Sequence, residues 1–280
     1  MQLVLKKFDV ASIPDNSIVV LISRRNGGKT TCLKDIMYYH SDIPVGTVIN
    51  PTESANKSYS HMVPSLFIHE EYSPKLIGDL LTRQKTMTKR VNKEKVTYGK
   101  QMTDPRAFLI LDDCMYDNIW KKDKSMRYIF LNGRHQQLFC MITLQYVLGI
   151  PPELRNNVDY AFIFRDNNLS NRKRLYENYC SVIPTFEMFN TIMDSVTTDG
   201  YGCLVINNLA RSHKLEDCVF WYEASIHPPF TIGSKEFWAK HNELAADDDD
   251  EDGDELYDPS VYSRAKNKTG PTLNIKKSYR

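Results

Sequence analysis

The sequence predicts an α/β fold in which helices flank a mostly parallel sheet, followed by a flexible C-terminal tail. Short apolar runs alternate with longer segments of helical period along most of the 280 residues, an order typical of parallel strands joined by crossover helices. A glycine-bearing turn follows the first clear strand, and a pair of aspartates ends a later one. The composition, 41% hydrophobic and 25% charged, is ordinary for a globular domain.

The apolar runs have the length of strands, and the segments between them have the length of helices. Strands are expected at residues 17–22, 47–50, 66–69, 108–111, 139–144, 160–164, 203–207 and 218–222. Helices are expected at residues 31–39, from about residue 74, and at residues 124–137, 171–180 and 185–195. No repeat of fixed period interrupts this alternation, so a single α/β domain is expected.

We assign residues 1–244 to this domain and residues 245–280 to a tail. The run AADDDDEDGDE, residues 245–255, holds eight carboxylates, so the part before it carries a basic excess if the whole chain is +1. The residues that follow are polar and basic and contain few large apolar side chains. Such a segment buries too little surface to fold by itself. It is either a solvated low-complexity tail or a docking or autoinhibitory arm that mimics nucleic acid.

Membrane insertion and secretion are not expected from the sequence. No stretch reaches the roughly 18 apolar residues that a membrane span needs, and the N-terminal MQLVLKKFDV lacks the features of a signal peptide. The cysteines are scattered without a CxxC pair, and most have apolar neighbours. We therefore expect a cytosolic protein whose cysteines are reduced and bind no zinc. The six cysteines are Cys32, Cys114, Cys140, Cys180, Cys203 and Cys218.

The loop SRRNGGKT, residues 23–30, is the strongest chemical signal. It ends like the phosphate-binding pattern G-x-x-x-x-G-K-[S/T], in which backbone amides surround a phosphate, the lysine reaches the terminal phosphates and the hydroxyl binds Mg²⁺. Ser23 stands where glycine is usual. The alternative is a polar turn between a strand and a helix. ATP and Mg²⁺ are the cofactors expected, with nucleotide contacts at Ser23, Arg24, Arg25, Asn26, Gly27, Gly28, Lys29, Thr30 and Thr31.

Two further polar positions follow predicted strands. FLILDD ends in Asp112, to which we assign Mg²⁺ together with Thr30, and Asp113, to which we assign polarisation of the attacking water. Two aspartates in this position can also be helix caps. FCMITL ends at Gln145, which is either a sensor of the γ-phosphate or a side chain bonded to local backbone.

Four motifs occur together within residues 17–166, namely SRRNGGKT, FLILDDC, NGRHQQLFCMITLQY and GIPPELRNNVDYAFIFRD. This combination resembles the FtsK/HerA superfamily of P-loop ATPases, and within it the poxvirus-type genome-packaging ATPases of nucleocytoplasmic large DNA viruses. The resemblance implies a RecA/FtsK-like fold in which Lys29 and Thr30 hold ATP and magnesium, Asp112 and Asp113 form the acidic motif, and Gln145 is the sensor.

The resemblance also implies an arginine supplied by a neighbouring subunit of a homo-oligomeric ring, a pentamer or hexamer. Arg134 is our first candidate for this residue, and Arg155 is the second. A planar, permanently charged guanidinium suits the charge that develops on a transferred phosphoryl group. The alternative is that Arg134 is a surface arginine paired with a carboxylate. In that case Arg24 or Arg25 would supply the positive charge within the same subunit.

Residues 83–100, RQKTMTKRVNKEKVTYGK, contain seven basic residues and one acid, Glu94. We interpret them as a cationic loop that follows a phosphate backbone without reading sequence, to which Arg172, Lys173 and Arg174 add. A solvated helix face is the alternative. Double-stranded DNA is favoured as the partner mainly by the family resemblance.

The expected function is therefore ATP hydrolysis coupled to translocation of viral double-stranded DNA into capsids, with capsid or portal proteins as partners. The expected location is the host cytoplasm, at the viral factory, or the virion. Two other classes remain open: a P-loop kinase of a small acceptor, and a non-catalytic nucleotide-binding protein associated with the capsid.

Overall fold

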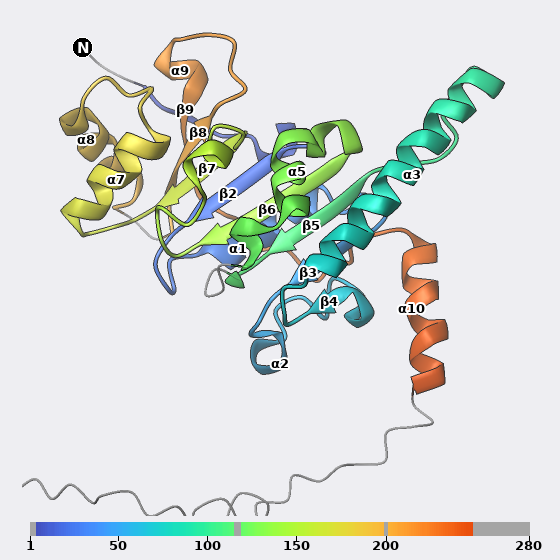
Figure 1. Cartoon of the computed structure of the whole chain (residues 1–280). Coiled ribbons are helices and arrows are strands. Elements are labelled where there is room, and N and C mark those ends of the chain that lie inside the picture. The colour runs from blue at the N-terminus through green and yellow to red at the C-terminus, as the bar shows by residue number, and fades with distance from the viewer. Residues whose placement is uncertain (1–3, 115–118, 199–200, 249–280) are drawn as a thin grey trace, which may run out of the picture. The chain divides into compact units, whose positions relative to one another are not determined.

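The computed structural model describes residues 4–114, 119–198 and 201–248, and these residues build a nine-stranded sheet (Figure 1). Its order in space is β1-β9-β8-β7-β2-β6-β5-β3-β4. The strands are β1 (Lys6–Lys7), β2 (Ile18–Ile22), β3 (Gly46–Ile49), β4 (Ile68–His69), β5 (Ala107–Leu111), β6 (Leu138–Leu144), β7 (Tyr160–Phe164), β8 (Cys203–Asn207) and β9 (Val219–Tyr222).

The sheet is parallel from β7 to β4, as the sequence predicts, and β8 adds an antiparallel strand beside β7. Every residue of β2, β5, β6 and β7 is buried. This agrees with their almost wholly apolar sequences, because helices cover both faces of a parallel sheet. β6 lies between β2 and β5, so the carboxyl ends of these three strands meet at one edge.

Helices form a layer on each face of the sheet (Figure 1). The longer ones are α1 (Lys29–Tyr39), α3 (Pro74–Tyr98), α5 (Lys124–Asn132), α7 (Leu169–Tyr179), α8 (Phe186–Val196) and α10 (Lys235–Asp248). The short ones are α2 (Glu53–Asn56), α4 (Ile119–Lys122), α6 (Pro152–Arg155) and α9 (Leu215–Cys218), with 3-10 turns η1 (Val10–Ser12), η2 (Ser65–Phe67) and η4 (Gly133–Gln136). Side chains of α3, α5, α7 and α8 pack in one core, and those of α1 pack in the other.

The prediction of a cationic loop at residues 83–100 is wrong, because this segment is the C-terminal part of α3. From residue 79 to residue 98 the sequence has neither glycine nor proline, and it is rich in lysine, arginine and other helix formers. The helix ends at Gly99, whose φ of 68° suits glycine and whose N–H donates to the Lys95 carbonyl oxygen. The basic residues therefore lie on a helix that projects from the sheet (Figure 1).

Two other predicted elements differ in detail. Of the strand expected at residues 66–69, only Ile68–His69 is extended, after the turn η2. The helix expected at residues 124–137 divides into α5 and η4.

The chain separates into a compact unit, Met1–His241, and a second unit, Asn242–Arg280, of which residues 242–248 at the end of α10 are described. The predicted tail from residue 249 onward lies outside the described residues, and the domain boundary at residue 244 stays a prediction. All six cysteines are buried. In the part of the chain that the structure covers, no helix has both the length and the apolar character to cross a membrane.

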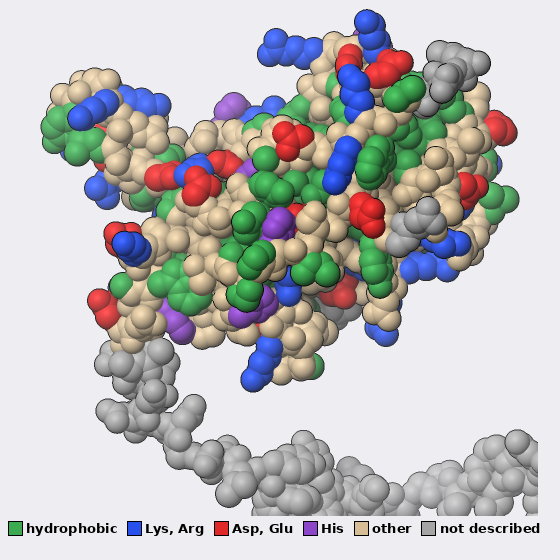
Figure 2. Space-filling model, turned by 180° about the vertical axis from the view of Figure 1, so that it is seen from behind, with side chains coloured by type: hydrophobic (Ala, Val, Ile, Leu, Met, Phe, Trp, Pro, Cys, Tyr) green, Lys and Arg blue, Asp and Glu red, His purple; other side chains and the backbone are tan. Residues whose placement is uncertain are grey.

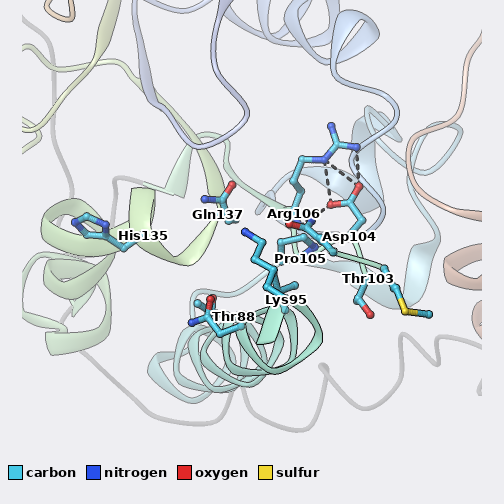
Figure 3. Close-up of a pocket in the computed structure, with 12 residues that line it drawn as sticks. Thr88, Lys95, Thr103, Asp104, Pro105, Arg106, His135 and Gln137 are labelled. Carbon is cyan, nitrogen blue, oxygen red and sulfur yellow. Dashed lines mark hydrogen bonds and ion pairs between the residues drawn. The ribbon is translucent and has the colours of Figure 1, made fainter. Parts of the chain in front are cut away.

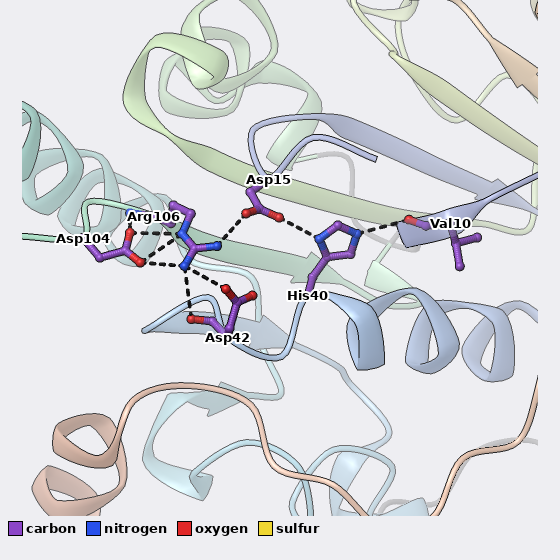
Figure 4. A network of polar contacts seen from close by, with 6 residues as sticks. All are labelled: Val10, Asp15, His40, Asp42, Asp104 and Arg106. Carbon is purple, nitrogen blue, oxygen red and sulfur yellow. Dashed lines mark hydrogen bonds and ion pairs between the residues drawn. The ribbon is translucent and has the colours of Figure 1, made fainter. Parts of the chain in front are cut away.

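An ion network joins the N-terminal segment, the end of α1 and the start of β5 (Figure 4). The Arg106 guanidinium lies 2.6 Å from Asp15, 3.0 Å from Asp42 and 2.7 Å from Asp104. Asp15 also contacts Nδ1 of the buried His40 at 2.6 Å. Hydrogen bonds from His40 and Arg106 lower the pKa of the Asp15 carboxyl, although burial opposes them.

We expect Arg106→Gln to lower the free energy of unfolding by about 2 kcal/mol at neutral pH, because three carboxylates lose their shared cation. A carboxyl whose pKa is lowered by folding stabilises the protein above its unfolded pKa, and this contribution is lost as the pH falls through the folded pKa. Denaturant unfolding between pH 7 and pH 3 should therefore show a smaller acid-induced loss in the variant. Arg127→Gln, which breaks the exposed pair with Glu153, is the matched control; an equal loss there would contradict this account.

Candidate active site

The loop between β2 and α1 forms a tight turn at the carboxyl edge of the sheet. Asn26 and Gly28 have positive φ values of 57° and 91°. A Cβ at Gly27 would lie 1.7 Å from the Ser23 hydroxyl oxygen, so the loop closes only with glycine there. Ser23 Oγ is buried, and no partner for it is found among the described residues. The Ser23 side chain therefore fills the space above Gly27.

Lys29 is the first residue of α1, and its side chain binds backbone carbonyl groups of the loop. Its ammonium donates to the carbonyl oxygens of Ser23 and Arg24, both at 3.1 Å, and only 6% of the residue is exposed. Burial lowers the pKa of Lys29, while the charges of Asp113 and Asp112 raise it. The positive charge is thus held at a helix N-terminus, where backbone N–H groups also favour an anion.

Asp112 follows β5 and is 5% exposed. Its Oδ1 accepts a hydrogen bond from the Thr143 hydroxyl at 2.6 Å. Its Oδ2 accepts from the Tyr59 hydroxyl at 2.7 Å and from the Thr30 hydroxyl at 3.2 Å. Thr30 and Asp112, the two residues predicted to bind Mg²⁺, therefore lie in contact, and their hydroxyl and carboxylate oxygens are the kind of ligand that this cation prefers.

The Asp113 side chain contacts the residue that follows β6, the strand between β5 and β2. Its Oδ1 accepts a hydrogen bond from Gln145 Nε2 at 2.7 Å, and Gln145 follows β6 directly. Asp113 is partly exposed and lines the cavity in front of the loop. The predicted water-polarising acid and the predicted sensor are therefore paired in the structure.

Lys29, Thr30 and Asp113 line a cavity of about 660 Å³, whereas Asp112 and Gln145 do not line it. Its lining is mostly polar and comes from the loop, α1, α2 and the segment before β8. The lining residues are Arg25, Asn26, Gly27, Gly28, Lys29, Thr30, Thr31, Thr52, Asn56, Asp113 and Tyr201. A cavity of this size with convergent polar groups is suited to a small ligand.

Besides Thr143, four residues of this region were not predicted from the sequence. Thr52 and Asn56 line the cavity from the β3–β4 connection, and Tyr201 lies so close to the loop that a Cβ at Gly28 would approach its ring at 3.0 Å. Tyr59 reaches Asp112 across 53 positions of sequence. None of them belongs to a local motif, so only the fold brings them here.

A second cavity, of about 670 Å³, lies beside α3 and away from these residues (Figure 3). Lys95 of α3, His135 and Gln137 near the start of β6, and Arg106 near the start of β5 line it. It therefore opens at the amino edge of the sheet, opposite the glycine-bearing loop. Arg106 is already paired with Asp104 there, and the cavity contains none of the residues assigned to nucleotide or Mg²⁺.

The candidate arginines lie in three different settings. Arg24 pairs with Asp166 at 2.9 Å. Arg155 donates to the Ile150 carbonyl oxygen at 2.9 Å and packs on the Tyr179 ring.

Arg134 lies in η4, before the amino end of β6, and is ion-paired with Asp159. Gln145 follows the opposite end of the same strand. The seven residues of β6 separate these ends by roughly 23 Å, so Arg134 lies at the edge of the sheet opposite the cavity of its own subunit.

The sheet order, with the glycine-bearing loop after β2 and the acidic strand β5 on the other side of β6, is that of a P-loop NTPase. The chain is 35% identical over 238 residues to protein L437 of Acanthamoeba polyphaga mimivirus, covering 85% of this chain and 82% of that protein. It is 39% identical over 208 residues to protein 075L of Invertebrate iridescent virus 6, covering 74% of each. The chain therefore belongs to this family of proteins from nucleocytoplasmic large DNA viruses.

Solved structures confirm the predicted P-loop NTPase fold. The genome-packaging NTPase B204 of Sulfolobus turreted icosahedral virus 2, in complex with AMPPCP, matches with a TM-score of 0.52 and 15% identity, over 76% of this chain and 100% of that one. The pCW3 conjugation coupling protein TcpA with ATPγS also has a TM-score of 0.52, at 12% identity, over 85% and 66%. No family model matches the sequence.

Proposed function

We propose that this protein is an ATP-driven translocase that packages viral double-stranded DNA into capsids. The observation that carries the proposal is the meeting of Lys29, Thr30, Asp112, Asp113 and Gln145 at one edge of the sheet. They supply a cation for the phosphates, a pair of oxygen ligands for Mg²⁺, a general base and a polar contact to that base. This is the set that hydrolysis of a nucleoside triphosphate requires.

Each residue has a separate task in this reaction. Lys29 stabilises negative charge on the β- and γ-phosphates, and Thr30 and Asp112 would hold Mg²⁺, which neutralises charge on the same oxygens when bound. Asp113 accepts a proton from the attacking water, and Gln145, by donating to Asp113 Oδ1, keeps that carboxylate facing the cavity. The other loop residues, Ser23 to Gly28, and Thr31 contribute the phosphate cradle.

The coupling to DNA is supported by the likeness of the fold to that of B204, a genome-packaging NTPase, and by the charge of α3. Lys85, Lys89 and Lys93 are exposed and spaced by four residues, so they share one face of the helix. Several basic side chains lie on the projecting end of α3, on the left in Figure 2, among hydrophobic and other side chains. Contacts of this kind bind phosphates without reading sequence, as a motor on DNA requires.

We infer that the protein acts as a homo-oligomeric ring, a pentamer or hexamer, with capsid or portal proteins as partners. We infer that it acts at the viral factory in the host cytoplasm, or in the virion. Arg134 is proposed to complete the active site of the neighbouring subunit, and Arg155 is the second candidate.

The proposal is tested by ATP hydrolysis with and without duplex DNA. We expect DNA to stimulate hydrolysis by the wild type, and Lys29→Ala to abolish it. Stimulation by a small phosphate acceptor instead of DNA would indicate a kinase. Nucleotide binding without any hydrolysis would indicate a capsid-associated binding protein. A Lys29→Ala variant that keeps most of its activity would refute the phosphate-binding assignment.

The basic face of α3 leads to a prediction about DNA affinity. Replacing Lys85, Lys89 and Lys93 together by glutamine should weaken binding to every duplex sequence alike. The slope of log K against log salt should become shallower by about 1 for each DNA phosphate that the protein no longer neutralises. Fluorescence anisotropy over a salt series measures both quantities.

The matched control removes the same charge from other exposed positions, Lys122, Lys124 and Lys214. It should change the salt slope much less than the α3 variant. Equal slopes for the two triple variants would show that α3 acts only through net charge and is not the DNA contact.

A further inference from the structure

We propose that Thr143 is a positioning residue for both aspartates of the acidic motif. Its hydroxyl holds Asp112 by a hydrogen bond to the carboxylate and holds Asp113 by a hydrogen bond from the backbone N–H. This inference rests on the proposed ATP hydrolysis. Thr143 is fully buried in β6, between the strand that precedes the glycine-bearing loop and the strand that precedes the aspartates. A hydroxyl in an otherwise apolar strand requires hydrogen-bond partners when it is buried.

The Thr143 hydroxyl has two such partners, and they are consecutive residues. It donates to Asp112 Oδ1 at 2.6 Å and accepts the Asp113 backbone N–H at 3.0 Å. One oxygen atom therefore links the side chain of the proposed magnesium ligand to the backbone of the proposed base.

The bond to Asp112 decides which carboxylate oxygen is available. Because Oδ1 is held by Thr143, it is Oδ2 that faces the Thr30 hydroxyl, at 3.2 Å. The Tyr59 hydroxyl also donates to Oδ2, at 2.7 Å. Thr143 thus fixes the rotation of the carboxylate, and Tyr59 supports the same orientation by holding the other oxygen.

The bond to Asp113 supports an unfavourable backbone conformation. Asp113 has a φ of 53°, which a residue with a Cβ adopts at a cost. The backbone N–H of Asp113 has no partner in the backbone of β6, because the pairing of β5 with β6 ends at Leu111. By accepting this N–H, Thr143 holds the turn that directs the Asp113 carboxylate to Gln145.

Two substitutions at Thr143 distinguish the effect of the hydroxyl group from the effect of side-chain size. Thr143→Val keeps the branched shape but can neither donate to Asp112 nor accept from Asp113, whereas Thr143→Ser keeps both hydrogen bonds. We expect Thr143→Val to lower kcat and the affinity for the metal by 10- to 100-fold, the range found for partners of metal-binding side chains. Thr143→Ser should remain within about 3-fold of the wild type, because the hydroxyl is retained. Tyr59→Phe should weaken metal affinity with a smaller effect on kcat, since Tyr59 does not contact Asp113.

The experiment measures Mn²⁺ binding by electron paramagnetic resonance in the presence of ATP, ATP binding in EDTA with a fluorescent analogue, and steady-state ATP hydrolysis. The expected result for Thr143→Val is weaker Mn²⁺ binding and lower kcat, with ATP binding in EDTA unchanged. Thermal melting verifies the fold, and Thr143→Ala is a second variant without the hydroxyl if the valine variant is unfolded.

Wild-type values of Mn²⁺ affinity and kcat in a folded Thr143→Val or Thr143→Ala protein would overturn the role of Thr143 while leaving the proposed ATPase intact. Loss of both in Thr143→Ser as well would also overturn it, because the hydroxyl would then not be what matters. If instead wild-type and Lys29→Ala proteins hydrolyse ATP equally, the proposed ATPase site fails, and the Mn²⁺ titration still decides whether Thr143 orients Asp112.

Discussion

Asp113→Asn is expected to lower kcat for ATP hydrolysis by about 10² to 10⁴-fold, the range that a positioned general base contributes. The substitution keeps the size of the side chain, and its oxygen can still accept the hydrogen bond from Gln145 Nε2. What disappears is the ability to take a proton from water. Nucleotide binding should therefore remain close to that of the wild type, because Lys29 and Thr30 are unchanged.

Single-turnover hydrolysis and the binding of a fluorescent ATP analogue, both at saturating Mg²⁺, separate the two steps. Asp112→Asn is the matched control, since it neutralises the adjacent carboxylate that contacts Thr30 and should reduce Mg²⁺-dependent binding. If Asp113→Asn is the variant that loses nucleotide affinity, Asp113 is a metal ligand, and the two roles must be exchanged.

The sequence was sufficient for the features that are encoded locally. Lys29, Thr30, Asp112, Asp113 and Gln145 were predicted from motifs that follow strands, and the structure brings them to one edge because the carboxyl ends of parallel strands meet there. Their contacts in the structure, Thr30 with Asp112 and Gln145 with Asp113, follow from the position of β6 between β2 and β5.

Features that depend on tertiary packing could not be found in this way. Tyr59 lies in an irregular segment after α2, and nothing in its neighbourhood indicates that its hydroxyl reaches Asp112. The charge of residues 83–100 alone does not distinguish a loop from a solvated helix face, but the absence of a helix breaker before Gly99 favours the helix that the structure shows. Thr143 did have a signal, a hydroxyl inside a buried apolar strand, but its two partners become evident only when the strand order is known.

The same topology bears on the arginine that completes the site. Arg134 lies at the amino edge of the sheet, where it pairs with Asp159, while Lys29 and Asp113 lie at the carboxyl edge. At this distance from the cavity of its own subunit, Arg134 could complete an active site only in a neighbouring subunit; its alternative role is the ion pair with Asp159. Its side chain is 55% exposed, whereas that of Asp159 is 7% exposed, so Arg134 can turn outward. Burial raises the pKa of Asp159, although the Ile18 N–H and Arg134 oppose this, which lets the carboxyl take up a proton more readily when Arg134 leaves.

We expect Arg134→Ala to reduce kcat by roughly 10³ to 10⁵-fold, the value of an arginine supplied in trans, and Arg134→Lys to restore little, because a lysine lacks the planar fork. The decisive measurement mixes the inactive Arg134→Ala and Lys29→Ala proteins. In an equal mixture about a quarter of the interfaces of a closed ring combine an intact Lys29 with an intact Arg134 from the neighbour, so part of the activity should return. Native mass spectrometry verifies that mixed rings form. If such rings remain inactive, or if Arg134→Ala alone is nearly normal, then Arg155, or Arg24 and Arg25 within the same subunit, must supply the charge instead.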